Sequence, residues 1–232
     1  MTAKDTFFPV KKSITCNGQI VDLSTPRVMG ILNVTPDSFY DGGRFTNADA
    51  VVSQTRKMLS DGATWIDVGA VSSRPGAALP GEQEEMDRLF PVLELLSKEF
   101  PGILISVDTF RSGVAKVSVK EYNVCMINDI SAGNLDPLMF PVMAELNVPY
   151  VIMHMQGVPG TMQQNPEYNN VVEEVYAELA AKTTELRQLG VDDVIVDPGF
   201  GFGKTVAQNY ALLRGLSRFH DMNAHVLVGV SR

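Results

Sequence analysis

The chain has 232 residues, a formal net charge of −8 and 45% hydrophobic residues. This composition can fill one large core, and its acidity argues against a basic surface that collects nucleic acid or anionic membranes. The N-terminus lacks the apolar core of a signal peptide, and no run approaches the roughly 20 apolar residues that span a bilayer. Cys16 and Cys125 lie far apart without a C-x-x-C motif, which suits a reducing cytoplasm and predicts no disulfide between them.

The predicted elements begin with a β-hairpin and continue as strands alternating with helices. Residues 13–24 form two alternating runs around Asn17-Gly18, a dipeptide typical of a type I′ turn, so residues 1–26 are expected to carry a hairpin. Short apolar runs predict seven strands, at residues 28–34, 65–70, 103–108, 124–130, 150–154, 194–197 and 225–230. Helical patterns lie between them, at residues 47–61, 80–100, 112–121, 136–146, 171–189 and 206–216. In the fourth of these, Pro137 is expected at the first helical position.

The alternation predicts an α/β fold with a parallel sheet, and the polar strand ends distinguish between two architectures. A doubly wound sheet concentrates its ligand chemistry at one switch point. Here a polar residue follows nearly every strand: Asn33, Asp67, Asp108, Asn128, His154, Asp197 and Ser231. A barrel brings all these ends to one face. We therefore predict a single TIM-type (β/α)8 barrel domain over residues 1–232, with its eighth βα unit missing from this chain.

The stretch DPGFGFGKT, residues 197–205, is the richest in glycine. It is not a Walker A motif, because Pro198 stands where the first glycine is required, and Lys204 replaces the third glycine of a dinucleotide fingerprint. Its glycines still allow a ligand to approach the backbone closely, and Lys204 is a local cation. The alternative is an ordinary βα turn with a solvated lysine.

Asp108, Asn128 and Asp197 end different strands and predict a site for a nitrogen heterocycle. A carboxylate accepts two adjacent N–H groups, while an asparagine amide both donates and accepts. The alternative for any single aspartate is a cap or a turn. His154 is an open candidate for the site lining, and Arg74 is either an anion clamp or a solvated surface residue. No nucleophile stands beside a base, which favours a reaction that needs no enzyme nucleophile.

Six blocks carry a resemblance to a known family: MGILNVTPDSFYDGG, VGAVSSRPGA, SVDTFRS, INDISAG, MHMQGVPGTMQ and DPGFGFGKT. In order and spacing they resemble dihydropteroate synthase, the folate-pathway enzyme that sulfonamides inhibit. The resemblance implies a (β/α)8 barrel that joins 4-aminobenzoate to hydroxymethyl-dihydropterin diphosphate and releases diphosphate with Mg²⁺. It also implies a cytoplasmic homodimer.

The resemblance assigns three sets of residues. The pterin would be held by Asp108, Asn128, Ile130, Met153, Asp197, Phe202 and Lys204. Asn33 would contact the diphosphate and its Mg²⁺. The loop residues that would close over the substrates and form the aminobenzoate pocket are Asp37, Phe39, Ser73, Arg74 and Pro75.

The sequence departs from the family pattern in its second loop and at its end. Val71 and Ser73 replace a glutamate and a threonine, and the basic residues that the family carries beyond Arg232 are absent. Two alternatives therefore stay open. One is a pterin-binding protein or fragment without turnover, and the other is a methyltetrahydrofolate-binding methyltransferase domain. The TPDSF and SRPGA loops argue against the second alternative.

Overall fold

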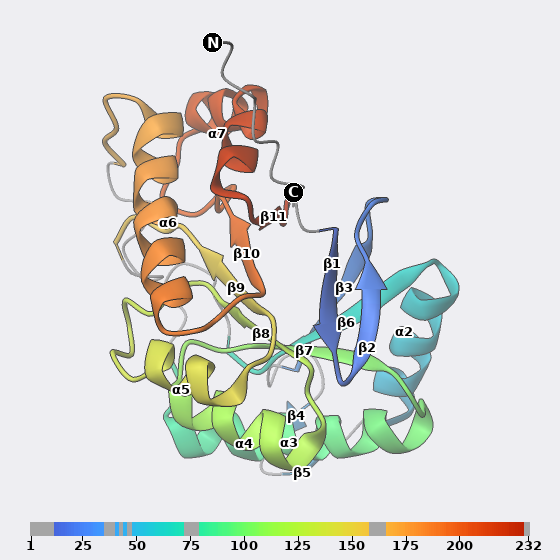
Figure 1. Ribbon diagram of the computed structural model, residues 1–232. Coiled ribbons are helices and arrows are strands. Elements are labelled where there is room, and N and C mark those ends of the chain that lie inside the picture. The colour runs from blue at the N-terminus through green and yellow to red at the C-terminus, as the bar shows by residue number, and fades with distance from the viewer. Residues whose placement is uncertain are drawn as a thin grey trace.

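A seven-stranded parallel sheet is the centre of the computed structural model, which describes residues 12–34, 40–41, 44–45, 48–71, 79–157 and 166–229. The strand order is β11-β10-β9-β8-β7-β6-β3, and the sheet is curled (Figure 1). The strands are β3 (Val28–Asn33), β6 (Ala63–Gly69), β7 (Leu104–Asp108), β8 (Met126–Asp129), β9 (Tyr150–Met153), β10 (Val194–Asp197) and β11 (His225–Val226). In the part of the chain that is described, β3 and β11 are the two edges.

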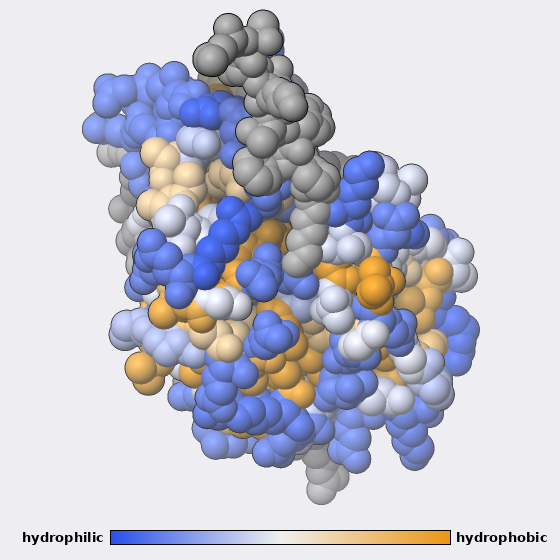
Figure 2. Space-filling view, viewed as in Figure 1, coloured by the Kyte–Doolittle hydropathy of each residue, from blue (hydrophilic) through white to orange (hydrophobic). Residues whose placement is uncertain are grey.

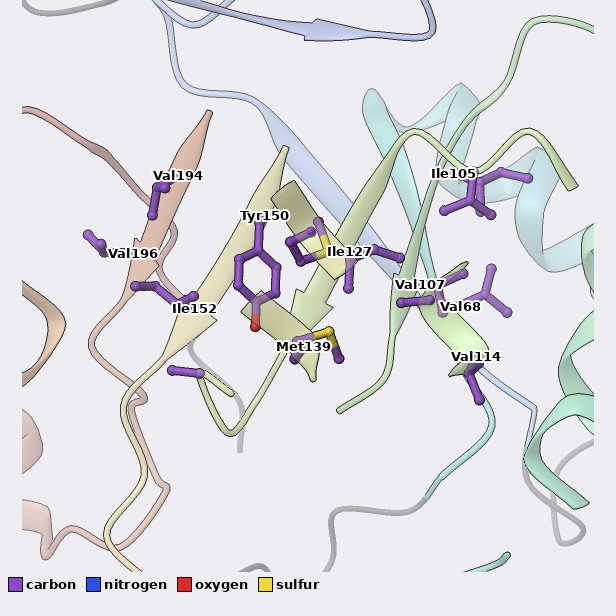
Figure 3. Packing of buried hydrophobic residues seen from close by; sticks show 14 of the residues in the cluster. Val68, Ile105, Val107, Val114, Ile127, Met139, Tyr150, Ile152, Val194 and Val196 are labelled. Atoms are coloured by element: carbon purple, nitrogen blue, oxygen red, sulfur yellow. The ribbon is translucent and has the colours of Figure 1, made fainter. Parts of the chain in front are cut away.

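Helices cover the convex face of this sheet. They are α2 (Ala48–Ser60), α3 (Glu82–Glu99), α4 (Ser112–Tyr122), α5 (Met139–Leu146), α6 (Val171–Gln188) and α7 (Val206–Arg214), followed by the 3₁₀ helix η1 (Leu216–Met222). The main core lies between these helices and the sheet. Figure 3 shows side chains of β7, β8, β9 and β10 packed with Val114 of α4 and Met139 of α5. None of the described helices is long and apolar enough to cross a membrane.

The prediction of a parallel α/β sheet with seven strands is confirmed, and each predicted range overlaps an observed strand. One helix start is wrong, since α5 begins at Met139 and Pro137 lies in a preceding turn. Asp136 caps this turn, since its carboxylate accepts the N–H of Leu138 at 2.9 Å and that of Ser112 at 2.7 Å. The sequence also did not predict η1 or the short antiparallel pair β4 (Tyr40–Asp41) and β5 (Arg44–Phe45).

The N-terminal hairpin is confirmed as β1 (Ser13–Cys16) and β2 (Gln19–Asp22). Asn17 and Gly18 have φ values of 48° and 74°, as a type I′ turn requires. Ile14 and Cys16 of the hairpin pack against inward-facing residues at the amino-terminal ends of the strands: Trp65, Cys125, Met126, Val151 and Ile195. The hairpin therefore closes the end of the curled sheet that lies opposite the strand carboxyl ends (Figure 1, dark blue).

The concave face of the sheet is open to solvent between β3 and β11. Ile31 of β3 is paired in register with the inward-facing Asp67, yet 65% of Ile31 is exposed. Val28 and Val228, near the same two edges, are also exposed. Figure 2 shows apolar residues in the middle of this view, between the hairpin and the part of the chain that contains α6 and α7.

Candidate active site

Four residues form one row across the carboxyl ends of neighbouring strands. The register pairs Asn33 with Gly69, Gly69 with Asp108, and Asp108 with Asn128. Gly69 makes this row possible, because a Cβ there would lie only 3.3 Å from both Asn33 Oδ1 and Asp108 Oδ2. Asn33 and Asp108 thus approach each other across the glycine, with Asn128 on the other side of Asp108.

Asp67 supports this row from one layer below. Asn128 Nδ2 donates to Asp67 Oδ2 at 2.9 Å, and only 4% of Asp67 is exposed. Because the amide N–H is used in this way, the amide oxygen of Asn128 is left to accept a bond from a ligand. Sequence reasoning placed Asp67 among the strand ends, whereas it lies two residues before the end of β6. Its spacing of two from Gly69 is the signal that both face the interior.

Ionisation of the Asp108 carboxyl group is unfavourable in this structure. Burial raises its pKa well above the usual range, and the negative charges of Asp67, Glu85 and Asp129 raise it further. A ligand that offers hydrogen-bond donors at this position relieves the cost of the charge. Asp108 is therefore suited to bind adjacent N–H groups, as the sequence predicted from its residue type.

Asp197 ends β10 and is held by the loop that follows it. Its Oδ1 accepts the N–H of Gly199 at 2.7 Å, and the strand register places it beside Met153 of β9. Burial raises the pKa of Asp197 to about 6, against the opposing effects of the Gly199 hydrogen bond and the nearby Lys204 ammonium. Like Asp108, this carboxylate is poised to accept donors from a bound ring.

Lys204 is neither a solvated lysine nor directed at an open site. It is 4% exposed, and its Nζ donates to the carbonyl oxygens of Gly199 and Phe202, each at 2.9 Å, and of His154 at 3.2 Å. The same nitrogen lies 3.0 Å from His154 Nδ1, while His154 Nε2 lies 3.3 Å from Glu178 Oε2. Burial lowers the pKa of Lys204 to about 7. In this structure Lys204 holds the loop at residues 199–203, and direct contact with a pterin stays a prediction.

An apolar cluster adjoins the polar row. It contains the predicted residues Ile130, Met153 and Phe202, together with Phe110, Met155, Val71 and Leu135. The sequence analysis missed Phe110 and Met155, although each follows a predicted site residue, Asp108 or Met153, by two positions. The Arg111 guanidinium lies 4.7 Å from the Phe110 ring centroid and bonds to Glu85 and the Pro80 carbonyl, which fixes the ring.

Other residues of the sequence lie outside the described ranges or away from the carboxyl ends of the strands. Asp37, Phe39, Ser73, Arg74, Pro75 and Ser231 lie outside the described residues. His220 is exposed on η1, and His225 is the first residue of β11, so neither lies at the carboxyl end of a strand. Within the described ranges, no group of three or more histidine, cysteine, aspartate or glutamate side chains is arranged to hold a metal ion.

Comparison with known proteins agrees with this site. The profile of the family described as "Pterin binding enzyme" matches residues 29–232. The dihydropteroate synthase of Haemophilus influenzae is 44% identical over 218 residues, covering 93% of this chain and 78% of that protein. A mitochondrial folate synthesis bifunctional protein of Pisum sativum is 47% identical over 220 residues, covering 88% of this chain and 42% of that longer protein.

Solved structures show the same relationship. Yersinia pestis dihydropteroate synthase in a sulfonamide complex has a TM-score of 0.86 and 42% identity, covering 94% of this chain and 79% of that one. The Xanthomonas albilineans enzyme with 4-aminobenzoic acid has a TM-score of 0.84 and 40% identity, covering 95% and 78% respectively. The chain therefore belongs to the pterin-binding enzyme family and, within it, to the dihydropteroate synthases.

Proposed function

We propose that this chain condenses 4-aminobenzoate with 6-hydroxymethyl-7,8-dihydropterin diphosphate to give 7,8-dihydropteroate and diphosphate. One arrangement supports the proposal. Two buried carboxyl groups with raised pKa values, those of Asp108 and Asp197, and the oriented amide of Asn128 lie beside an apolar cluster. Similar chains have been solved with 4-aminobenzoic acid and with 7,8-dihydropteroate, which supports this substrate class.

In the proposed binding mode, hydrogen-bond donors of the pterin face acceptors of the protein. The pterin edge presents ring N–H and amino donors, which Asp108 and Asp197 accept, while the Asn128 oxygen accepts a further N–H. Ile130, Met153 and Phe202 pack on the flat ring and exclude water from it. Binding the ring between oriented acceptors fixes its methylene carbon relative to the incoming amine.

The proposed reaction is dissociative. The bond from the pterin methylene carbon to the diphosphate oxygen breaks, and the positive charge on that carbon is delocalised into the pterin ring. The amine of 4-aminobenzoate attacks the methylene carbon and then loses a proton. Such a path requires electrostatic stabilisation, positioning and exclusion of water rather than an enzyme nucleophile.

Mg²⁺ fits the residues present at one end of the polar row. The side-chain oxygen of Asn33 lies near the Asp108 carboxylate across Gly69, and hard oxygen ligands are those that Mg²⁺ prefers. Asn33 would hold the ion together with diphosphate oxygens, and the ion would neutralise charge on the leaving diphosphate. We place Asp37, Phe39, Ser73, Arg74 and Pro75 in the aminobenzoate pocket on the family resemblance, which also supports a cytoplasmic homodimer.

The test is diphosphate release from the pterin diphosphate by this chain with Mg²⁺, with and without 4-aminobenzoate. We expect release that depends on aminobenzoate and yields dihydropteroate, and an Asp197→Ala variant serves as the inactive control. Pterin binding without release would identify a binding protein. Methyl transfer from methyltetrahydrofolate to a cobalamin protein would identify a methyltransferase domain.

A further inference from the structure

Two cysteines that are far apart in the sequence meet at the end of the sheet opposite the active site. Cys16 ends strand β1 of the hairpin, and Cys125 immediately precedes β8. Both are free thiols with 0% exposure, and they belong to the same buried cluster. The thiol of Cys16 lies close enough to that of Cys125 for each to shift the pKa of the other, and Cys125 Sγ lies 3.3 Å from the carbonyl oxygen of Ile105.

The residues around Cys16 fix its position over Cys125. Asn17 Nδ2 donates to the carbonyl of Asn123 at 2.8 Å, which ties the residue after Cys16 to the segment just before Cys125. On the other side, the backbone N–H of Thr15 donates to Asp193 Oδ2 at 3.1 Å. The two sulfur atoms are thus held together by backbone segments that are themselves linked.

The two thiols are not equivalent. The interaction between them lowers the pKa of Cys16, against the opposing effect of burial, and it raises the pKa of Cys125, which burial raises further. The first proton therefore leaves Cys16, while Cys125 keeps its own. A thiolate beside a second thiol is the arrangement of a cysteine that is oxidised and then resolved by its neighbour.

We propose that Cys16 and Cys125 form an oxidation site, in which a hydroperoxide converts the pair into an intramolecular disulfide that links the hairpin to the start of β8. The Cys16 thiolate attacks a peroxide oxygen and breaks the O–O bond, giving a sulfenic acid and a hydroxide or alkoxide that takes up a proton. The Cys125 sulfur then attacks the Cys16 sulfur, the S–O bond breaks, and water leaves with the Cys125 proton. Two thiols are oxidised and one hydroperoxide is reduced.

Local opening of the hairpin gives the peroxide access. In the described residues β1 and β2 pair only with each other, so the hairpin is held to the seven-stranded sheet by side-chain packing and by the hydrogen bonds of Thr15 and Asn17 rather than by a strand ladder. Such elements open at a lower free energy than the core of a domain. Once formed, the disulfide prevents this opening and closes a long loop, so it stabilises the fold. The substrate site at the other end of the sheet is unaffected.

The experiment treats the full chain with hydrogen peroxide and follows its thiols and peptides. We expect both thiols to disappear together, a linked peptide containing Cys16 and Cys125 in the mass spectrum, and full recovery with dithiothreitol. The unfolding midpoint of the oxidised chain is expected to rise by roughly 5–10 °C. Pterin binding measured on the same sample should not change, so this test is independent of the proposed activity.

Two single variants separate the roles of the thiols. Cys125→Ala keeps Cys16 without its resolving partner, so a dimedone adduct should accumulate on Cys16. Cys16→Ala should give little adduct on Cys125. Three results on the unsubstituted chain would overturn the proposal: thiols that resist peroxide at concentrations that oxidise the unfolded chain, oxidation to sulfinic acid without a linked peptide, and a disulfide only between two chains. These hold whether or not the variants fold.

Discussion

The side-chain amide of Asn128 donates to the carboxylate of Asp67 at 2.9 Å, and this bond decides which atom Asn128 presents to a ligand. The amide nitrogen is directed to the layer below, so the oxygen is directed to the site. Asp67 touches no ligand in this arrangement. It acts on the site through Asn128 and through its negative charge, which contributes to the raised pKa of Asp108.

Replacing Asp67 should therefore weaken pterin binding without removing a ligand contact. Asp67→Ala leaves the amide of Asn128 without its acceptor, and we expect the Kd of a hydroxymethylpterin to rise by roughly 10- to 100-fold. Asp67→Asn retains a carbonyl acceptor and should recover most of the affinity. Calorimetric titration of both variants checks this. Equal affinity of Asp67→Ala and the unsubstituted chain would show that Asn128 is oriented by other contacts.

Asp197 should lower the stability of the folded chain at neutral pH, although we expect its carboxylate to be needed for pterin binding. Its pKa is about 6 in the folded chain and about 3.9 when unfolded, so between pH 4 and 6 the folded state holds the proton that the unfolded state has lost. Stability therefore falls as pH rises through this window. Asp197→Asn removes this loss, and we expect it to gain up to about 2–3 kcal/mol at pH 7 and nothing below pH 4.

The same variant should lose pterin binding, because an amide cannot accept donors as a carboxylate does. Urea unfolding at pH 4 and pH 7, with pterin titrations alongside, separates the two effects. Asp61→Asn serves as the surface control, since Asp61 is exposed on the turn after α2. Equal unfolding free energies of Asp197→Asn and the unsubstituted chain at pH 7 would contradict the raised pKa.

Gly199 and Gly201 offer a matched pair for testing close packing in the glycine-rich loop. Both have positive φ, at 72° and 83°, so alanine at either position costs about 1 kcal/mol of backbone strain. At Gly199 a Cβ would also lie 2.0 Å from the backbone oxygen of His154, whereas nothing lies within 4 Å at Gly201. We expect Gly199→Ala to destabilise the chain by at least about 2 kcal/mol more than Gly201→Ala and to abolish pterin binding. Thermal unfolding of the two variants is the measurement, and similar midpoints would count against the packing argument.

The strands and the polar strand ends could be predicted because their signals are local. An apolar run that ends in a polar residue identifies both a buried strand and a residue at the mouth of the sheet, as at Asp108 and Asp197. Glycine density predicted that a ligand approaches the backbone of residues 197–205 closely, whereas at Gly199 the structure shows close approach of the His154 backbone oxygen. The 3₁₀ helix η1 was missed because a short 3₁₀ segment has no extended apolar period to detect.

The burial of Lys204 could not be predicted, because its partners are distant in sequence. His154 follows β9, Glu178 lies on α6, and only the tertiary fold brings both to the lysine. The contact between Cys16 and Cys125 has the same character. In both cases the sequence shows the residue type, but the neighbours that set its pKa come from other helices and strands, and only the tertiary structure identifies them.

Lys204 should make the free energy of unfolding increase as the pH rises above 7. Its pKa is about 7 when folded and near 10.4 when unfolded, so between these values the folded state binds fewer protons and stability rises with pH. The carboxylates of Asp197 and Glu178 oppose this lowering of the Lys204 pKa, and the ring nitrogen Nδ1 of His154 lies 3.0 Å from Lys204 Nζ. Lys204→Met removes the titrating group. The difference in free energy of unfolding between this variant and the unsubstituted chain should therefore change with pH, by up to about 1.4 kcal/mol per pH unit from pH 7 to 10.

Lys204→Met should also release the loop at residues 199–203, because the carbonyl oxygens of Gly199 and Phe202 lose their donor. We expect weaker pterin binding with the loop no longer fixed, and partial recovery in Lys204→Arg, which restores N–H donors but not the compact ammonium. Lys57→Met is a control, since Lys57 is an exposed lysine of α2 that pairs with Asp61. Parallel stability curves for Lys204→Met and the unsubstituted chain from pH 7 to 10, with unchanged pterin affinity, would mean that the pKa of Lys204 is not lowered in the folded chain and that its side chain does not hold the loop.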